Sequence, residues 1–268
     1  SEPVRRQIVD LLGSHVSITQ GDRSSLTGSQ VRLDGIEQRV EVFGPGTFDH
    51  NDPSKKAVIA ASWNLGMTFD DDSGLLECSG DSRVVSTPDP LTREEIEADR
   101  LKLAITPLAR GQSSVGEAPP KRELLRAEAI GSVLDREGGV NARVTSERFI
   151  ASPSLPEGRQ REQLQYLEGP RILADNAAGT LDVPGAGRMV LVDHADKPAS
   201  EPSAAPGLSL SGKQGDSLLS WATSMHMDRT SGKADLHGAV RLTNRSLLDR
   251  QVTNMDCEDL TVTVRTEG

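Results

Sequence analysis

The sequence predicts an all-β protein built from two copies of one antiparallel unit. The first observation is a repeat, in which the stretch from Trp221 to Val264 matches the stretch from Trp63 to Ile105. The second is an alternation of apolar and polar residues within each copy, which is typical of strands with one buried face. The third is the turn chemistry between these runs, Asp-Asp-Asp-Ser-Gly in one copy and Asp-Arg-Thr-Ser-Gly in the other, where glycine can adopt positive φ.

The repeat covers most of the chain and divides it into two units. Setting Trp63 on Trp221 aligns Met67 with Met225, Phe69 with Met227, Asp70 with Asp228, Gly74 with Gly232, Gly80 with Gly238 and Val84 with Leu242. Further upstream, at one constant spacing, Gly28, Val31, Val42 and Gly46 match Gly169, Ile172, Val183 and Gly187. A period this long indicates a domain-sized unit used twice. We therefore predict domains at 1–115 and 116–268, with a linker in the Gly-, Pro- and Ser-rich residues 111–121.

The first unit is expected to be a series of short strands. Residues 1–30 are interpreted as one or two edge strands, followed by a hairpin of 31–33 and 40–42 around Asp34-Gly35. Gly44-Pro45-Gly46 is expected to end that hairpin, residues 49–54 to form a loop, and residues 57–69 to return to the sheet. Thr92 and Glu95 fit a capping box, but the matching stretch of the second copy lacks helix propensity, so we expect at most one helical turn before a strand at 101–105.

The second unit follows the same plan with one insertion. Residues 124–130 are predicted to be a strand in a hairpin with 140–144, and residues 152–163 a charged loop. Residues 196–217 are rich in Pro, Ser and Ala and have no counterpart in the first copy. Their composition predicts a mobile insertion outside the shared core.

Composition limits the classes of function. Net charge is −10, which argues against nucleic acid as the main partner. Aromatic residues are only 3%, so aliphatic side chains must fill the core, and no apolar run reaches the length of a membrane-spanning helix. The chain starts with Ser-Glu-Pro and no leader, and we expect it to be a fragment of a larger protein. Cys78 and Cys257 do not match each other in the repeat and are predicted to be buried apolar residues, with a disulfide as the alternative.

No motif points to catalysis, a metal or a cofactor. The glycines at 44–46 and 185–187 lack the third glycine and the helix of a dinucleotide site. The Asp-His-x-Asp pattern at 49–52 and 193–196 could hold a divalent metal, but these are also ordinary turn residues. His226 and His237 are expected to form a polar pair across neighbouring strands. Since nucleophile elbows and paired catalytic carboxylates are also missing, we predict a protein that is not an enzyme.

The remaining signal is an apolar stripe along each copy. It either fills a small sandwich or lines a groove for acyl chains, in which each buried methylene contributes about 0.8 kcal/mol and methionines keep the groove adaptable. The candidate lipid-groove residues are Trp63, Leu65, Met67, Phe69, Val84, Leu101, Leu103, Trp221, Met225, Met227, Leu236, Val240, Leu242, Leu260 and Val262.

The repeat resembles the periplasmic lipopolysaccharide-transport family of LptA/OstA type. The resemblance lies in Met225-His-Met-Asp228, Gly238-Ala-Val240-Arg-Leu242 and Cys257-Glu-Asp-Leu260-Thr-Val262, and more loosely in Met67-Thr-Phe-Asp70. It implies two V-shaped antiparallel β-jelly-roll modules stacked edge to edge, with lipid tails carried in an apolar interior.

The function that the resemblance implies is non-enzymatic lipid binding and transport in a bacterial envelope bridge, located in the periplasm. The expected partners are lipopolysaccharide or another acylated envelope lipid, and other β-jelly-roll modules that add to an open sheet edge. The alternative is a structural β-repeat scaffold of an envelope or surface protein with a packed, ligand-free interior. A carbohydrate-binding module or jelly-roll enzyme is less favoured, because sugar sites normally expose aromatic platforms.

Overall fold

The computed structural model describes residues 8–21, 23–52, 57–107, 123–132, 140–152, 155, 158–194, 214–248 and 250–263. Within these ranges the chain forms 17 strands and no helix, so the all-β prediction is confirmed. Every pairing between strands is antiparallel. No helix of the described part of the chain is long and apolar enough to span a membrane.

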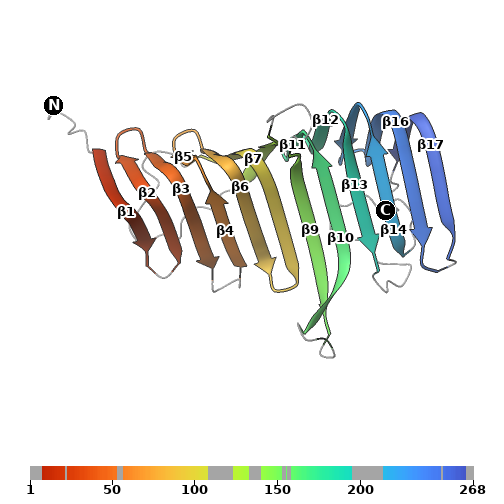
Figure 1. Ribbon diagram of the computed structural model, residues 1–268, viewed down its shortest axis with the longest axis horizontal. Coiled ribbons are helices and arrows are strands. Elements are labelled where there is room, and N and C mark those ends of the chain that lie inside the picture. The colour runs from red at the N-terminus through yellow and green to blue at the C-terminus, as the bar shows by residue number, and fades with distance from the viewer. Residues whose placement is uncertain are drawn as a thin grey trace.

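The strands follow one another along the long axis of the molecule, from β1 to β17 (Figure 1). The strands up to the chain's middle are β1 (Ile8–Gln20), β2 (Ser24–Asp34), β3 (Arg39–Asp52), β4 (Ala57–Trp63), β5 (Gly66–Asp70), β6 (Leu75–Asp89), β7 (Thr92–Ile105) and β8 (Leu124–Ile130). The others are β9 (Ala142–Ala151), β10 (Arg159–Gly169), β11 (Arg171–Asp175), β12 (Thr180–Pro184), β13 (Gly187–Asp193), β14 (Gly215–Trp221), β15 (Ser224–Asp228), β16 (Lys233–Ser246) and β17 (Val252–Thr263).

The strands form two rows that face each other. In the view of Figure 1, the front row contains β4, β9, β10, β13 and β14, and the rear row contains β5, β8, β11, β12 and β15. The long strands β3, β6, β7 and β16 belong to both, because one half of each pairs in the front row and the other half in the rear row. Since β7 and β16 join the rows, ten strands form a closed ring, with β1–β6 and β17 outside it.

Glycines allow the long strands to bend from one row into the other. Gly80 in β6 and Gly238 in β16 have φ of 78° and 79°, and each lies at a register shift in its strand. Gly46 and Gly187 each allow a tryptophan ring to pack directly on the backbone. A Cβ on Gly187 would lie 2.5 Å from the ring of Trp221, and a Cβ on Gly46 would lie 2.7 Å from the ring of Trp63. The prediction that the glycines at 44–46 end a strand is therefore wrong, since β3 continues through them to Asp52.

The two sequence copies have the same pairings. In the first copy β3 pairs with β4 and β5, both of these pair with β6, and β6 pairs with β7. In the second copy β13 and β12 take the place of β3, and β14, β15, β16 and β17 repeat the pattern. The matching turn glycines Gly74 and Gly232 have φ of 68° and 66°.

One hydrophobic core runs between the rows through both copies. Its largest buried side chains include Trp63, Leu101, Leu219, Met225 and Val240, each 2% exposed or less. The core consists mainly of aliphatic side chains and methionines from the two rows, with Trp63 and Trp221 as its buried aromatic residues, in agreement with the low aromatic content of the sequence.

Four further local predictions were wrong. Residues 49–52 and 159–163, which were expected in loops, belong to β3 and β10. The strand expected at 101–105 begins earlier, at Thr92, so residues 92–100 contain no helical turn. Residues 57–69 return to the sheet as predicted, divided into two strands, because β4 pairs with the second half of β3 and β5 with its first half. Residues 124–130 form a strand as predicted, but β8 and β9 are not partners in a hairpin, since both pair with β7. The predicted linker at 111–121 and most of the insertion at 196–217 lie outside the described residues.

Candidate functional site

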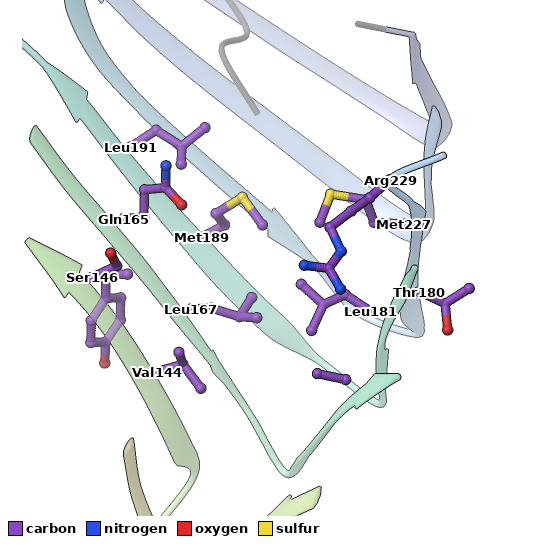
Figure 2. A pocket seen from close by; sticks show the side chains of 12 residues that line it. Val144, Ser146, Gln165, Leu167, Thr180, Leu181, Met189, Leu191, Met227 and Arg229 are labelled. Carbon is purple, nitrogen blue, oxygen red and sulfur yellow. The ribbon is translucent and has the colours of Figure 1, made fainter. Parts of the chain in front are cut away.

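A cavity of about 150 Å³ lies between the two rows, inside the ring of ten strands. It is bounded by strands of the second copy and is lined mainly by apolar side chains (Figure 2). The residues that line it are Val144, Ser146, Gln165, Tyr166, Leu167, Ala174, Thr180, Leu181, Met189, Leu191, Met227 and Arg229.

Strand register explains why these side chains meet. In the front row Val144, Leu167 and Met189 lie directly opposite one another on β9, β10 and β13. In the rear row Ala174, Leu181 and Met227 lie in line on β11, β12 and β15. Since side chains at directly opposed positions project from the same face of a sheet, each row presents one continuous apolar line to the other.

Polar groups lie around this apolar lining. Ser146 and Gln165 lie opposite each other, two residues along their strands from Val144 and Leu167, and therefore project from the same face of the sheet. Thr180 and Arg229 occupy the corresponding end of the rear row. Apolar walls with a few placed polar groups are the usual composition of a ligand site.

Arg229 is held in place by its backbone and by one side-chain contact. Its N–H donates to the carbonyl of Gly179 at 2.8 Å, and its Nη2 donates to Oδ1 of Asn176 at 2.8 Å. Asn176 is fixed in turn, because its Nδ2 donates to the carbonyl of Leu124 at 2.9 Å. Among the described residues no carboxylate forms an ion pair with Arg229, and its side chain is directed toward Leu181 and the cavity (Figure 2).

A cluster of hydrogen bonds on the outer face braces the wall formed by β10 and β13. Glu168 accepts hydrogen bonds from the Tyr166 hydroxyl, from Nη2 of Arg188 at 2.9 Å and from Nδ2 of Asn141 at 3.3 Å. Partial desolvation favours the protonated carboxyl, but these donors outweigh it and hold the pKa of Glu168 below its ordinary value.

The predicted groove residues lie in four environments. Only Met227 lines the cavity. Half of the others are buried in the core, where Trp63, Met67, Leu101, Trp221, Met225, Leu236 and Val240 are 7% exposed or less. A third set packs on that core with partial exposure, namely Phe69, Val84, Leu103, Leu242, Leu260 and Val262. Leu65 does not face the interior: it lies in the turn between β4 and β5 and is 69% exposed.

Sequence reasoning missed most of the lining. The apolar stripe predicted from the sequence runs from each tryptophan through the strands that follow, whereas the cavity is bounded mainly by β9–β13. A usable signal exists upstream, where the alignment of Gly28 and Val42 with Gly169 and Val183 continues to Met189. That alignment sets the smaller residues Ala174 and Met189 of the cavity lining against Leu33 and Phe48.

Four histidines of the described residues form hydrogen-bonded pairs with aspartate or serine side chains. His226 Nδ1 lies 2.6 Å from Asp182 Oδ1 and His237 Nδ1 lies 2.7 Å from Asp259 Oδ1, so each histidine pairs with an aspartate and not with the other histidine. His50 contacts the hydroxyl of Ser24 at 2.8 Å. In the part of the chain that the structure describes, no three His, Cys, Asp or Glu side chains are grouped so that they could hold a metal ion.

The two cysteines are free and differ in environment. Cys78 is 1% exposed, and burial raises the pKa of its thiol to about 12, whereas Cys257 is half-buried and borders a surface hollow at Val240 and Asp256. Because the thiolate is the reactive species, we expect iodoacetamide at pH 8 to label Cys257 in the native protein at least about 100-fold faster than Cys78. Mass mapping of the labelled peptides checks this, and unfolding in urea should equalise the two rates. Similar native rates would contradict the packing of Cys78.

Comparisons of the chain with protein-family models, with curated proteins and with solved structures found no match.

Proposed function

We propose that this protein binds an acylated lipid between the two rows of strands and passes it along a bacterial envelope bridge without chemical change. The observation that carries the proposal is the cavity of about 150 Å³, with apolar walls and a polar border, between the rows. An alkyl chain placed there gains about 0.8 kcal/mol for each methylene removed from water. The cargo that the proposal names is a lipopolysaccharide-like lipid, and the location it implies is the periplasm.

The proposed architecture is a pair of V-shaped jelly-roll modules of LptA/OstA type joined edge to edge. The repeated strand pairings and the long strands shared between two rows support it. In this arrangement the last strand of the first module, β7, joins the second module by pairing with β8 and β9.

Open edges support association with further modules of the same kind. Within the described residues, β1 pairs with β2 alone and β17 with β16 alone, so each leaves one edge without a partner strand. β17 holds in the second copy the place that β7 holds in the first, where Leu101 lies opposite Ala129 of β8. Leu11 of β1 lies opposite Val31 as Ala129 lies opposite the matching Ile172. The same register would therefore bring Leu260 of one molecule opposite Leu11 of the next, in the manner of strand addition.

A disulfide test distinguishes this register from chance contact. In a Cys257→Ser background, Leu11→Cys together with Leu260→Cys should produce ladders of crosslinked chains on a non-reducing gel, because opposed antiparallel residues lie close enough for a disulfide. The matched control pairs Leu260→Cys with Leu12→Cys, whose side chain projects from the other face. Equal crosslinking in both pairs, or none in either, would rule out edge addition in this register.

Lipid binding is tested directly on the purified chain. Native mass spectrometry should detect acylated species bound to protein prepared from a Gram-negative host, and a photoactivatable lipopolysaccharide should crosslink saturably. Leu181→Asp places a carboxylate on the cavity wall and should weaken binding by about tenfold or more, equivalent to 1.4 kcal/mol. Leu65→Asp adds the same charge on the exposed turn and should leave binding unchanged. A chain that neither carries nor captures acylated species would refute the proposal.

The packed scaffold remains the second candidate because the first copy favours it. There Leu33, Phe48 and Phe69 pack against the core between the rows. A scaffold of this kind predicts no bound lipid in either copy, so the same mass spectra decide between the two functions.

A further inference from the structure

We infer that ligand binding is confined to the second copy, where the cavity holds one alkyl chain of an amphiphile whose anionic head group binds Arg229, and that large side chains close the same space in the first copy. This inference rests on the proposed function and specifies its site and the class of its ligand.

Strand register identifies the matching positions without ambiguity. Leu181 lies between Ala174 and Met227 in the rear row, and in the first copy Val40 lies in the same way between Leu33 and Phe69.

The front row matches in the same manner. Met189 lies between Leu167 and Leu219, and Phe48 lies between Leu26 and Ala61. The second copy therefore has Ala174, Met189 and Met227 where the first has Leu33, Phe48 and Phe69.

Of the five differences at these matched positions, three make room in the second copy, and two, Leu181 for Val40 and Leu219 for Ala61, take some of it up. Ala174 lacks the isobutyl group of its counterpart Leu33. Met189 and Met227 have flexible, unbranched side chains that can be displaced along an alkyl chain, whereas their phenylalanine counterparts are rigid rings. Both sets belong to the hydrophobic core or pack on it, but Met189, Leu181 and Met227 also border the cavity (Figure 2).

The charge at the border also differs between the copies. The N–H of Asp71 donates to the carbonyl of Gln38 at 3.0 Å, as the N–H of Arg229 donates to that of Gly179. The two residues therefore occupy equivalent positions with opposite charge. Arg229 has no carboxylate partner among the residues that the structure describes, and its guanidinium can bind a carboxylate or a phosphate in a bidentate manner.

The size of the cavity limits the ligand to one chain. A cavity of about 150 Å³ is comparable to engineered apolar cavities that hold a single benzene molecule. It can therefore take a segment of one alkyl chain at a time, so a lipopolysaccharide-like cargo would insert one of its chains and leave the others outside. A single-chain amphiphile with an anionic head satisfies both the narrow apolar space and Arg229.

The closing experiment exchanges the matched residues between the copies. The probes are dodecanoate and dodecyl phosphate carrying a diazirine, with diazirine-labelled dodecanol as the uncharged form. In the wild type the crosslinks should map to residues 140–194 and 224–232. The variant Ala174→Leu/Met189→Phe/Met227→Phe should lose at least about 90% of crosslinking, and Ala174→Leu alone should lose part of it. The reverse variant, Leu33→Ala/Phe48→Met/Phe69→Met, should retain the second-copy crosslinks and acquire new ones at residues 24–71.

The head group is tested separately. Arg229→Asp, which installs the residue of the first copy, should weaken binding of dodecanoate or dodecyl phosphate by about tenfold and leave dodecanol unchanged. The stronger of the two anionic probes identifies the head group as carboxylate or phosphate. Arg229→Lys should restore most of the binding.

The outcomes separate this inference from the proposed function. Three results would overturn the inference and leave lipid binding intact. The first is crosslinking of the wild type in residues 24–71, and the second is undiminished binding by an Ala174→Leu protein that has wild-type circular dichroism. The third is an equal loss of binding of all three probes in Arg229→Asp. Failure of the wild type to bind any amphiphile, including the photoactivatable lipopolysaccharide, would overturn both.

Discussion

Gly187→Ala is expected to lower the free energy of unfolding by about 3 kcal/mol, the upper part of the usual range for overpacking. A Cβ at this position would lie 2.5 Å from the Trp221 ring and 2.7 Å from the carbonyl oxygen of Glu168. Neither can withdraw, because the ring is 3% exposed within the core and the carbonyl belongs to the neighbouring strand β10. Urea unfolding followed by tryptophan fluorescence measures the change.

The repeat supplies a second instance, and β1 supplies a control. Gly46→Ala should be destabilising to the same degree, since its Cβ would lie 2.5 Å from the carbonyl oxygen of Thr27 and 2.7 Å from the Trp63 ring. Gly13→Ala should change stability by less than about 0.5 kcal/mol, because the nearest atom to its Cβ would be 3.7 Å away. A Gly187→Ala protein as stable as Gly13→Ala would show that the tryptophan does not pack on the glycine.

Much of the fold could be predicted from residues that act locally. The alternation of apolar and polar residues predicts which face of a strand is buried. Gly74 and Gly232 predict the tight turns before β6 and β16, because glycine adopts positive φ without steric cost, whatever the distant strands do. Pairing could not be predicted in the same way. The bend at Gly46 and the division of residues 57–69 between two rows depend on which distant strand accepts each half of β3, and alternation contains no information about partners.

The candidate site was less predictable because it depends on the opposite wall. A stripe such as Met225, Met227 and Leu236 shows which side chains point inward, but not whether the facing row fills the space between them. The cavity exists where Ala174 and Met189 leave room, and small residues are an ambiguous signal until their counterparts Leu33 and Phe48 are set beside them. The comparison of the two copies, and not either copy alone, carries the information.

Met225→Asp is expected to destabilise the protein by at least about 4 kcal/mol, combining the loss of a buried methionine with an unpaired buried carboxylate. Met225 is 2% exposed and lies between Val183 and Leu236 on the adjacent strands, so the carboxylate would have apolar neighbours on both sides. Since most domains are stable by only about 5–15 kcal/mol, this change should remove a large part of the stability of the fold. Circular dichroism and urea unfolding measure the effect.

Leu65→Asp is the matched control, because the sequence predicts that Leu65 and Met225 line the same groove. Leu65 is 69% exposed, and its replacement should alter stability by less than about 0.5 kcal/mol. The contrast decides how binding data must be interpreted: loss of lipid in Met225→Asp would report loss of the fold, whereas loss in Leu181→Asp or Arg229→Asp would report on the site. A stable, folded Met225→Asp protein would instead mean that water reaches Met225. The cavity would then extend from Met227 to Met225 and admit a longer alkyl chain.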